Sequence, residues 1–168
     1  MPSSGKSTLG RQLAKSLSYH YFDMDKVIEE LEQMSIAEIF AQKGEDYFRK
    51  LERKVLKTLP KDSRLVVSTG GGAPCFFDNI QLIRDGGLSI YFDVPVEILY
   101  ERMVNARRND RPLYSKDDPQ LLDNLKLKHQ IRQPIYTQAD LVISGDNITI
   151  DQVMMVLQSH NQRLGAIS

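Results

Sequence analysis

The sequence has 168 residues, 41% hydrophobic and 26% charged, which is typical of one globular domain with a single core. Lysine and arginine number 22, as do aspartate and glutamate, so charge indicates neither a nucleic-acid nor a membrane partner. No apolar run approaches the roughly 18 residues of a membrane-spanning helix. Cys75 stands alone, which excludes a disulfide framework and favours a cytoplasmic location. The three histidines are too far apart in sequence to suggest a metal site.

The first half of the chain alternates between predicted helices and short apolar strands. In chain order the sequence predicts helix 6–17, strand 20–22, helix 27–31, a helix opened by the capping box 35–38, helix 45–59 and strand 65–68. Gly44 interrupts the helical pattern, and Pro60 stops it.

The second half continues the alternation and contains one long polar segment. It predicts helix 78–84, strand 88–92, helix 96–103, a mobile polar loop over 105–119, helix 121–131, strand 140–144 and helix 150–157. The pattern predicts an α/β fold with a parallel sheet covered on both faces. In such sheets ligands bind at the carboxyl ends of the strands.

The strongest motif is Gly5-Lys6-Ser7-Thr8, which matches the end of the phosphate-binding loop G-x-x-x-x-G-K-[ST]. In that loop backbone amides surround the phosphates, Lys6 reaches their outer oxygens and Ser7 holds Mg²⁺. The first glycine of the motif would fall at position zero, and the strand that should precede it is absent.

The first acidic pair of interest follows the first predicted strand. Asp23 and Asp25 are two residues apart, so in extended chain they would point to the same side. Beside a bound nucleotide they could hold Mg²⁺ through water and orient a substrate hydroxyl. Alternatively, Asp25 caps the following helix.

Two further patterns have a functional and a purely structural interpretation. Arg49 and Glu52 are i, i+3 on a helix and form either a surface ion pair or an anion-binding arginine with its supporting carboxylate. The glycines at 70–72 follow a strand directly and form either a flexible turn or a backbone that a ligand can approach closely.

Arginines gather at the polar loop and at the end of the next helix. Arg102, Arg107, Arg108 and Arg111 are either a solvated basic stretch or part of a lid that stabilises a transferring phosphoryl group. Arg132 is either a second anion clamp or a helix C-terminal cation before Pro134.

The order of these motifs resembles the shikimate kinase family over nearly the whole chain. The order ends with Arg-Pro-Leu and Arg-x-Pro-x-Tyr, and its most specific part is Arg49-Lys50-Leu51-Glu52, then Leu56, then the run from Val66 to Gly72. The resemblance implies a three-layer α/β/α P-loop kinase fold with a short, mostly or wholly parallel sheet of five strands. It also implies one domain over 1–168, with a core over 1–104 and 119–168, a lid over 105–118 and a shikimate-binding region over 25–60.

The resemblance further implies transfer of the ATP γ-phosphoryl group to the 3-hydroxyl of shikimate in aromatic amino acid biosynthesis. Mg²⁺ would be held by Ser7 and, through water, by Asp23. The implied catalytic residues are Lys6, Asp25 and Arg111. The implied ATP-binding residues are Ser4, Gly5, Lys6, Ser7, Thr8, Arg102, Arg107 and Arg111. The implied shikimate-binding residues are Asp25, Arg49, Gly70, Gly71, Gly72 and Arg132.

The expected partners are ATP and shikimate, with no nucleic acid and no membrane, and we expect a monomer. Whether Arg102 or Arg107 packs on adenine stays open. The alternatives are a gluconate or nucleoside monophosphate kinase of the same fold, and an inactive ligand-binding relative. Because the missing strand would lie inside the sheet, we expect about ten apolar residues upstream, ending in glycine; without them the sheet would have a gap and the loop would be malformed.

Overall fold

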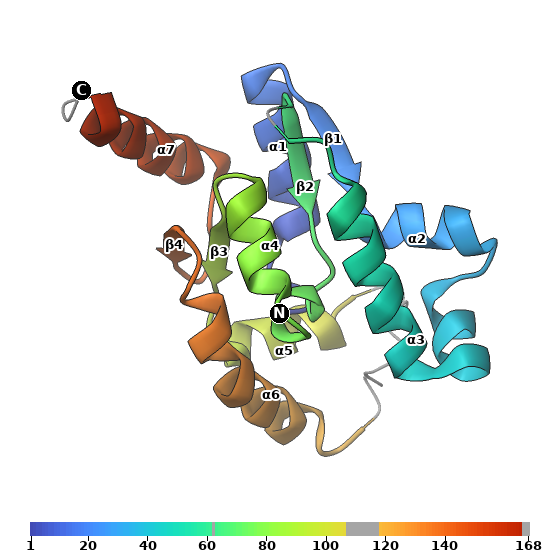
Figure 1. Cartoon of the computed structure of the whole chain (residues 1–168). Coiled ribbons are helices and arrows are strands. Elements are labelled where there is room, and N and C mark those ends of the chain that lie inside the picture. Colours follow the sequence, from blue (N-terminus) through green and yellow to red (C-terminus); the bar gives the residue numbers. More distant parts are fainter. Residues whose placement is uncertain (62, 107–117, 166–168) are drawn as a thin grey trace.

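The computed structural model describes residues 1–61, 63–106 and 118–165 (Figure 1). Its elements follow the predicted alternation of helix and strand. In chain order they are α1 (Lys6–Leu17), β1 (His20–Asp23), α2 (Met24–Glu32), α3 (Ile36–Thr58), β2 (Leu65–Ser68), the 3₁₀ helix η1 (Ala73–Cys75), α4 (Asn79–Gly86), β3 (Ile90–Asp93), α5 (Val96–Val104), α6 (Leu121–Tyr136), β4 (Leu141–Ser144) and α7 (Ile150–Gly165).

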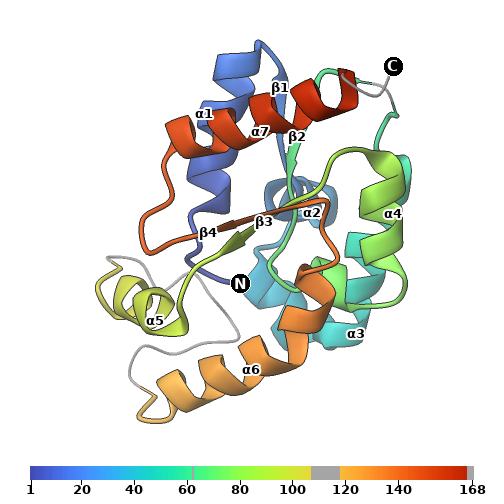
Figure 2. The same ribbon diagram turned by 90° about the vertical axis from the view of Figure 1, so that its left-hand side faces the viewer.

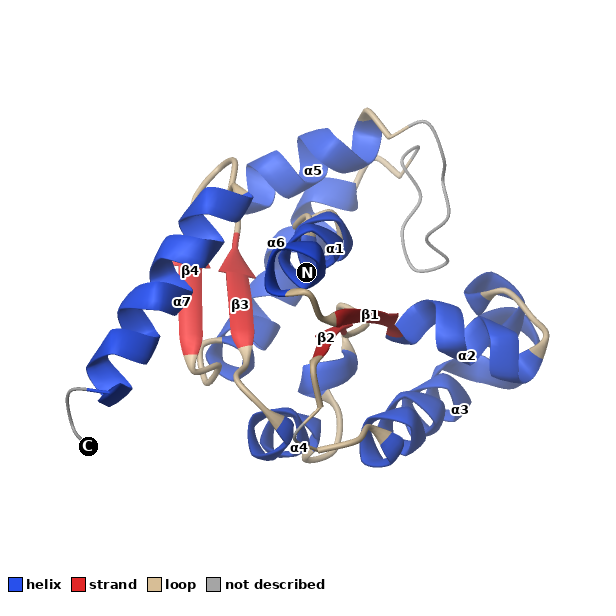
Figure 3. Cartoon of the chain, turned by 90° about the horizontal axis from the view of Figure 1, so that it is seen from above, coloured by secondary structure: helices blue, strands red, loops and turns tan. Residues whose placement is uncertain are grey.

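The four described strands form two parallel pairs, β1 with β2 and β3 with β4. Figure 3 shows the two pairs set apart from each other. Helices α1 and α7 lie on one side of the strands, and α3 and α4 lie on the other (Figure 2). The three-layer α/β/α arrangement is therefore confirmed, while β2 and β3 do not pair. The upstream strand stays a prediction.

Helix α3 carries several of the predicted site residues, and its course depends on two local signals. The predicted capping box is present: Ser35 Oγ accepts from the Glu38 amide, and the Glu38 carboxylate accepts from the Ser35 amide. Gly44 kinks the helix with φ 81° and ψ 171°, a conformation that is essentially restricted to glycine. The second half of α3 therefore starts in a new direction at Glu45.

Helix α6 continues further than the sequence predicted. We expected it to end before Pro134, but the helix runs through Pro134 to Tyr136. Proline removes only one amide donor, and the final turn is still closed by the Thr137 amide, which donates to the Gln133 carbonyl at 2.9 Å. Arg132 and Tyr136 therefore lie one turn apart on the same helix.

Two apolar clusters hold the layers together. The larger joins α1 and α7 to β3, β4, α5 and α6, and the smaller joins α2, α3 and η1. Met1 is buried in the larger cluster. Within the ranges that the structure describes, we find no helix with the length and apolar character needed to cross a bilayer.

Candidate active site

The phosphate-loop motif forms a turn that leads directly into α1. Gly5 adopts φ 87° at the N-cap, and the first amide bonded within the helix is that of Leu9, which donates to the Gly5 carbonyl at 2.9 Å. The amides of the first turn, which includes Lys6 and Ser7, thus have no acceptor within the helix and point out of its end. Ser68, at the end of β2, donates its hydroxyl to the Lys6 carbonyl, which ties this turn to the strand edge.

Asp23 and Asp25 do not form the extended pair that we expected. Helix α2 begins at Met24, so the two carboxylates leave the chain in different directions. Asp23 accepts a hydrogen bond from the Tyr21 hydroxyl at 3.1 Å and lies 3.6 Å from the guanidinium of Arg11. The same Tyr21 hydroxyl interacts with Ser7. Ser7 and Asp23, the two residues predicted to hold Mg²⁺, therefore both contact the hydroxyl of Tyr21.

Asp25 points instead toward the glycine segment after β2. A methyl group on Gly70 would lie 2.8 Å from Asp25 Oδ1 and 2.4 Å from Glu52 Oε1. Both distances are too short for a real Cβ contact, so any side chain at position 70 would force these two carboxyl groups to move. The constraint comes from the approach of two carboxyl groups and not from a left-handed backbone. Among the described glycines φ is positive at Gly5, Gly44 and Gly145, and Gly70 is not one of them.

Arg49 is buried, so the interpretation as a surface ion pair is wrong. Only 3% of Arg49 is exposed, and Glu52 is fully buried. Arg49 Nη1 donates to Glu52 Oε2 at 2.7 Å, while Nε and Nη2 donate to Glu45 Oε1 at 3.1 and 2.7 Å. The guanidinium also lies 4.2 Å from the ring centre of Phe76, close enough for a cation–π contact.

Glu52 is an unusual carboxyl group for a protein interior. Burial raises its pKa to about 7, although the charge and hydrogen bond of Arg49 lower it and the charge of Asp25 raises it further. Its Oε1 atom is buried and has no hydrogen-bond partner among the residues that the structure describes. An acceptor left in this way is costly, and it indicates a place where a ligand or a water molecule binds.

The other two glycines of the segment, Gly71 and Gly72, also lie close to neighbouring groups. A methyl group on Gly72 would lie 2.8 to 3.0 Å from the guanidinium atoms of Arg49, and one on Gly71 would lie 3.4 Å from the Met1 backbone. The Gly71 carbonyl accepts a 2.5 Å hydrogen bond from the hydroxyl of Tyr136. Tyr136 belongs to the sequence motif Arg-x-Pro-x-Tyr, but nothing in the sequence indicated this contact.

Arg132 and Lys128 bring two further cations from α6. Arg132 interacts electrostatically with Glu52 and with Tyr136, so it shares the neighbourhood of Arg49. Burial and the charge of Arg132 lower the pKa of Lys128, and Glu45 raises it. Lys128 was not predicted from the sequence, because a lysine on a polar helix face carries no distinguishing signal.

The predicted arginines of the lid are only partly described. Arg102 donates to the carbonyls of Ser3 at 3.2 Å and of Asp146 at 2.6 Å, so it links the phosphate loop to the segment before α7. Arg107, Arg108 and Arg111, and most of the predicted lid 105–118, lie outside the described residues. Within 1–61, 63–106 and 118–165, no group of three or more His, Cys, Asp or Glu side chains could hold a metal ion unaided.

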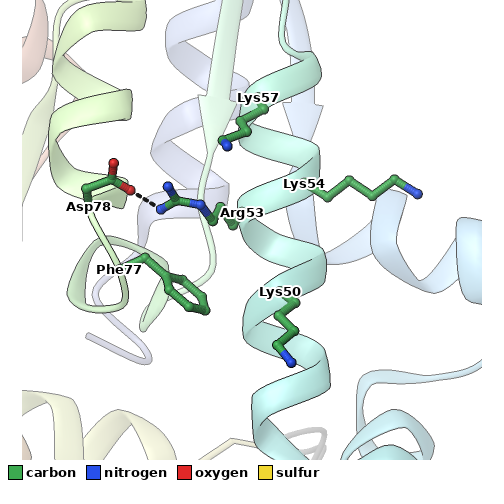
Figure 4. A pocket seen from close by; sticks show the side chains of 6 residues that line it. All are labelled: Lys50, Arg53, Lys54, Lys57, Phe77 and Asp78. Carbon is green, nitrogen blue, oxygen red and sulfur yellow. Dashed lines mark hydrogen bonds and ion pairs between the residues drawn. The ribbon is translucent and has the colours of Figure 1, made fainter.

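A second, basic hollow lies between α3 and the loop before α4 (Figure 4). Its lining residues are Lys50, Arg53, Lys54, Lys57, Phe77 and Asp78. Arg53 pairs there with Asp78 and lies over the ring of Phe77. None of the predicted site residues within the described part of the chain lines this hollow, and Arg49 is not among its lining residues.

Comparison with known proteins gives one consistent result. The family model described as shikimate kinase matches residues 2–160. A shikimate kinase of Clostridium botulinum (strain Loch Maree / Type A3) is 45% identical over 147 residues, which cover 88% of this chain and 85% of the relative. One of Bacteroides thetaiotaomicron is 35% identical over 145 residues, covering 86% and 83%.

Solved structures agree with the sequence comparison. A crystal structure of the Bacteroides thetaiotaomicron shikimate kinase has a TM-score of 0.84 at 34% identity and covers 95% of this chain and 93% of that one. The Acinetobacter baumannii shikimate kinase in complex with shikimate has a TM-score of 0.84 at 31% identity, covering 95% and 88%. This chain belongs to the shikimate kinase family.

Proposed function

We propose that this protein is an ATP-dependent kinase that transfers the γ-phosphoryl group of ATP to the 3-hydroxyl of shikimate. The observation that carries the proposal is the buried guanidinium of Arg49, held between Glu52 and the backbone of Gly72. A buried, preoriented arginine suits a planar carboxylate, which it binds through two parallel hydrogen bonds. Shikimate is a small cyclic carboxylate with three hydroxyl groups.

The acceptor half of the site would use both arginines and one aspartate. Arg49 and Arg132 grip the substrate carboxylate from α3 and α6, and the segment 70–72 lies against the substrate ring. Asp25 Oδ1, which already lies against Gly70, accepts the proton of the 3-hydroxyl as its oxygen attacks phosphorus. Phosphoryl transfer needs mainly this positioning, together with stabilisation of charge.

The donor half would lie at the start of α1. Ser4, Gly5, Thr8 and the first-turn amides surround the phosphates, and Lys6 contacts their outer oxygens. Ser7 and Asp23 offer the oxygen atoms that Mg²⁺ prefers, and both approach Tyr21. When bound, Mg²⁺ would neutralise charge on the phosphates. Arg102, Arg107 and Arg111 are assigned to the nucleotide and to the closing lid.

Substitution of each arginine by alanine tests the assignment of the acceptor site. Loss of one partner of a charge-assisted pair costs about 2–5 kcal/mol, so R49A and R132A should each raise the shikimate KM about thirtyfold or more. The ATP KM should change little. A steady-state assay of ADP release with each substrate varied measures both constants. Equal increases in the two KM values would contradict the role of these arginines as carboxylate ligands.

A further inference from the structure

The second partner of Arg49 is an exposed carboxylate that the proposed function leaves without a role. Glu45 Oε1 accepts hydrogen bonds from both Nε and Nη2 of Arg49, at 3.1 and 2.7 Å. These two donors form one edge of the guanidinium, and this is one of the edges on which arginine binds a carboxylate bidentately. An internal carboxylate thus occupies the place on Arg49 that a substrate carboxylate would take.

The two glutamates on Arg49 differ in a way that indicates different roles. Glu52 is fully buried and holds Nη1, so it cannot leave without exposing an uncompensated charge. The Glu45 side chain is 43% exposed and directly follows the kink at Gly44. Water can replace its hydrogen bonds at little cost. Glu52 is therefore a fixed support, and Glu45 is a partner that can be displaced.

The geometry also favours an incoming carboxylate over Glu45. Glu45 offers a single oxygen to both donors, whereas a free carboxylate can place one oxygen on each donor in a parallel arrangement. Lys128 on α6 interacts electrostatically with Glu45, Arg49 and Arg132. An anion that approaches Arg49 therefore meets the same positive groups that attract Glu45.

We infer that Glu45 occupies the substrate-carboxylate subsite of Arg49 and must be displaced when the substrate binds. Glu45 therefore restricts binding to ligands whose carboxylate can replace it on the guanidinium. The inference rests on the proposed function, because it takes Arg49 as the carboxylate ligand. A ligand with a carboxylate can replace Glu45 on the guanidinium, and a neutral ring of the same shape cannot. Glu45 thereby keeps Arg49 oriented in the empty site and disfavours polyols that lack the acid group.

Isothermal titration of shikimate into three variants tests this role. Only the Glu45 side of this pair is solvent-exposed. A solvent-exposed partner contributes about 0.2–1 kcal/mol, so E45A, which removes the competitor, should lower the shikimate Kd by about 1.5- to fivefold. E45D keeps the charge but shortens the side chain by one methylene, so it should lose the contact and also bind more tightly. E101A, which removes an exposed glutamate on α5, is the control and should bind as the wild type does. The Kd of ATP should be unchanged in all three.

Several outcomes would overturn the inference. Wild-type or weaker shikimate binding in E45A would show that Glu45 does not compete. Tighter binding in E45A but not in E45D would assign the effect to the field of the charge and not to occupation of Arg49. Failure of the proposed function would appear differently, as absence of shikimate binding and turnover in the wild-type protein itself.

Discussion

The titration of Glu52 provides a quantitative test of the buried pair at the centre of the site. The carboxyl group has an ordinary pKa of 4.5, and burial raises it to about 7 in the folded protein. At pH values between 4.5 and about 7, Glu52 is protonated in the native state and ionised in the unfolded chain. Stability is therefore greatest below pH 4.5 with respect to this group and falls as pH rises toward 7. At about 1.4 kcal/mol per pH unit, the loss is about 3 kcal/mol.

The variant E52Q removes this titration with little change of shape. Its free energy of unfolding relative to the wild type should rise by about 3 kcal/mol between pH 4.5 and pH 8. Urea denaturation followed by circular dichroism at several pH values measures the difference, and the titrations of the other groups cancel in it. A difference that stays constant across this range, or that falls, would refute the assignment of Glu52 as a carboxyl group protonated by burial.

Three further predictions concern the backbone around the site. G70A should abolish activity, because its methyl group would overlap two carboxyl oxygens, whereas G86A, with open space around it, should keep wild-type kcat and KM in the ADP-release assay. G44A should lower the free energy of unfolding by about 1–3 kcal/mol, because φ 81° and ψ 171° are strained for any residue with a Cβ atom, although no atom of the described residues obstructs the new methyl group; thermal denaturation measures this loss. Y136F, which removes the hydrogen bond to Gly71, should cost about 1–2 kcal/mol of stability and raise the shikimate KM with little change in the ATP KM.

The sequence predicted the elements and the convergence of motifs well. Periodicity and caps located the helices, and apolar runs located the strands to within about two residues. The glycines at 70–72 and Asp25 were expected at the carboxyl ends of strands, and they meet there. These features depend on local patterns, which a sequence carries directly.

The features that were missed depend on long-range contacts. A local pattern of i, i+3 charges does not reveal that Arg49 is buried, because its burial comes from Phe76 and Gly72, which follow it by more than twenty residues. Likewise, Tyr136 reaches Gly71 only through the packing of α6. The division of the strands into two pairs is also a matter of spatial arrangement, which alternation alone does not determine.

The expectation for Asp23 and Asp25 failed for a local reason. Both were placed in extended chain, but α2 starts between them at Met24. The turn of the helix sends one carboxylate toward Tyr21 and the other toward Gly70. This separation agrees with the proposed site, in which Asp23 belongs to the donor half and Asp25 belongs to the acceptor half.

The identity of the acceptor is the central claim, and ADP release with Mg·ATP tests it most directly. Shikimate, gluconate and CMP are offered in turn to the wild-type protein, and the product is identified by phosphorus NMR. We predict turnover with shikimate, a product phosphorylated at the 3-hydroxyl and no turnover with the other two acceptors. Turnover with gluconate or CMP but not with shikimate would contradict the claim.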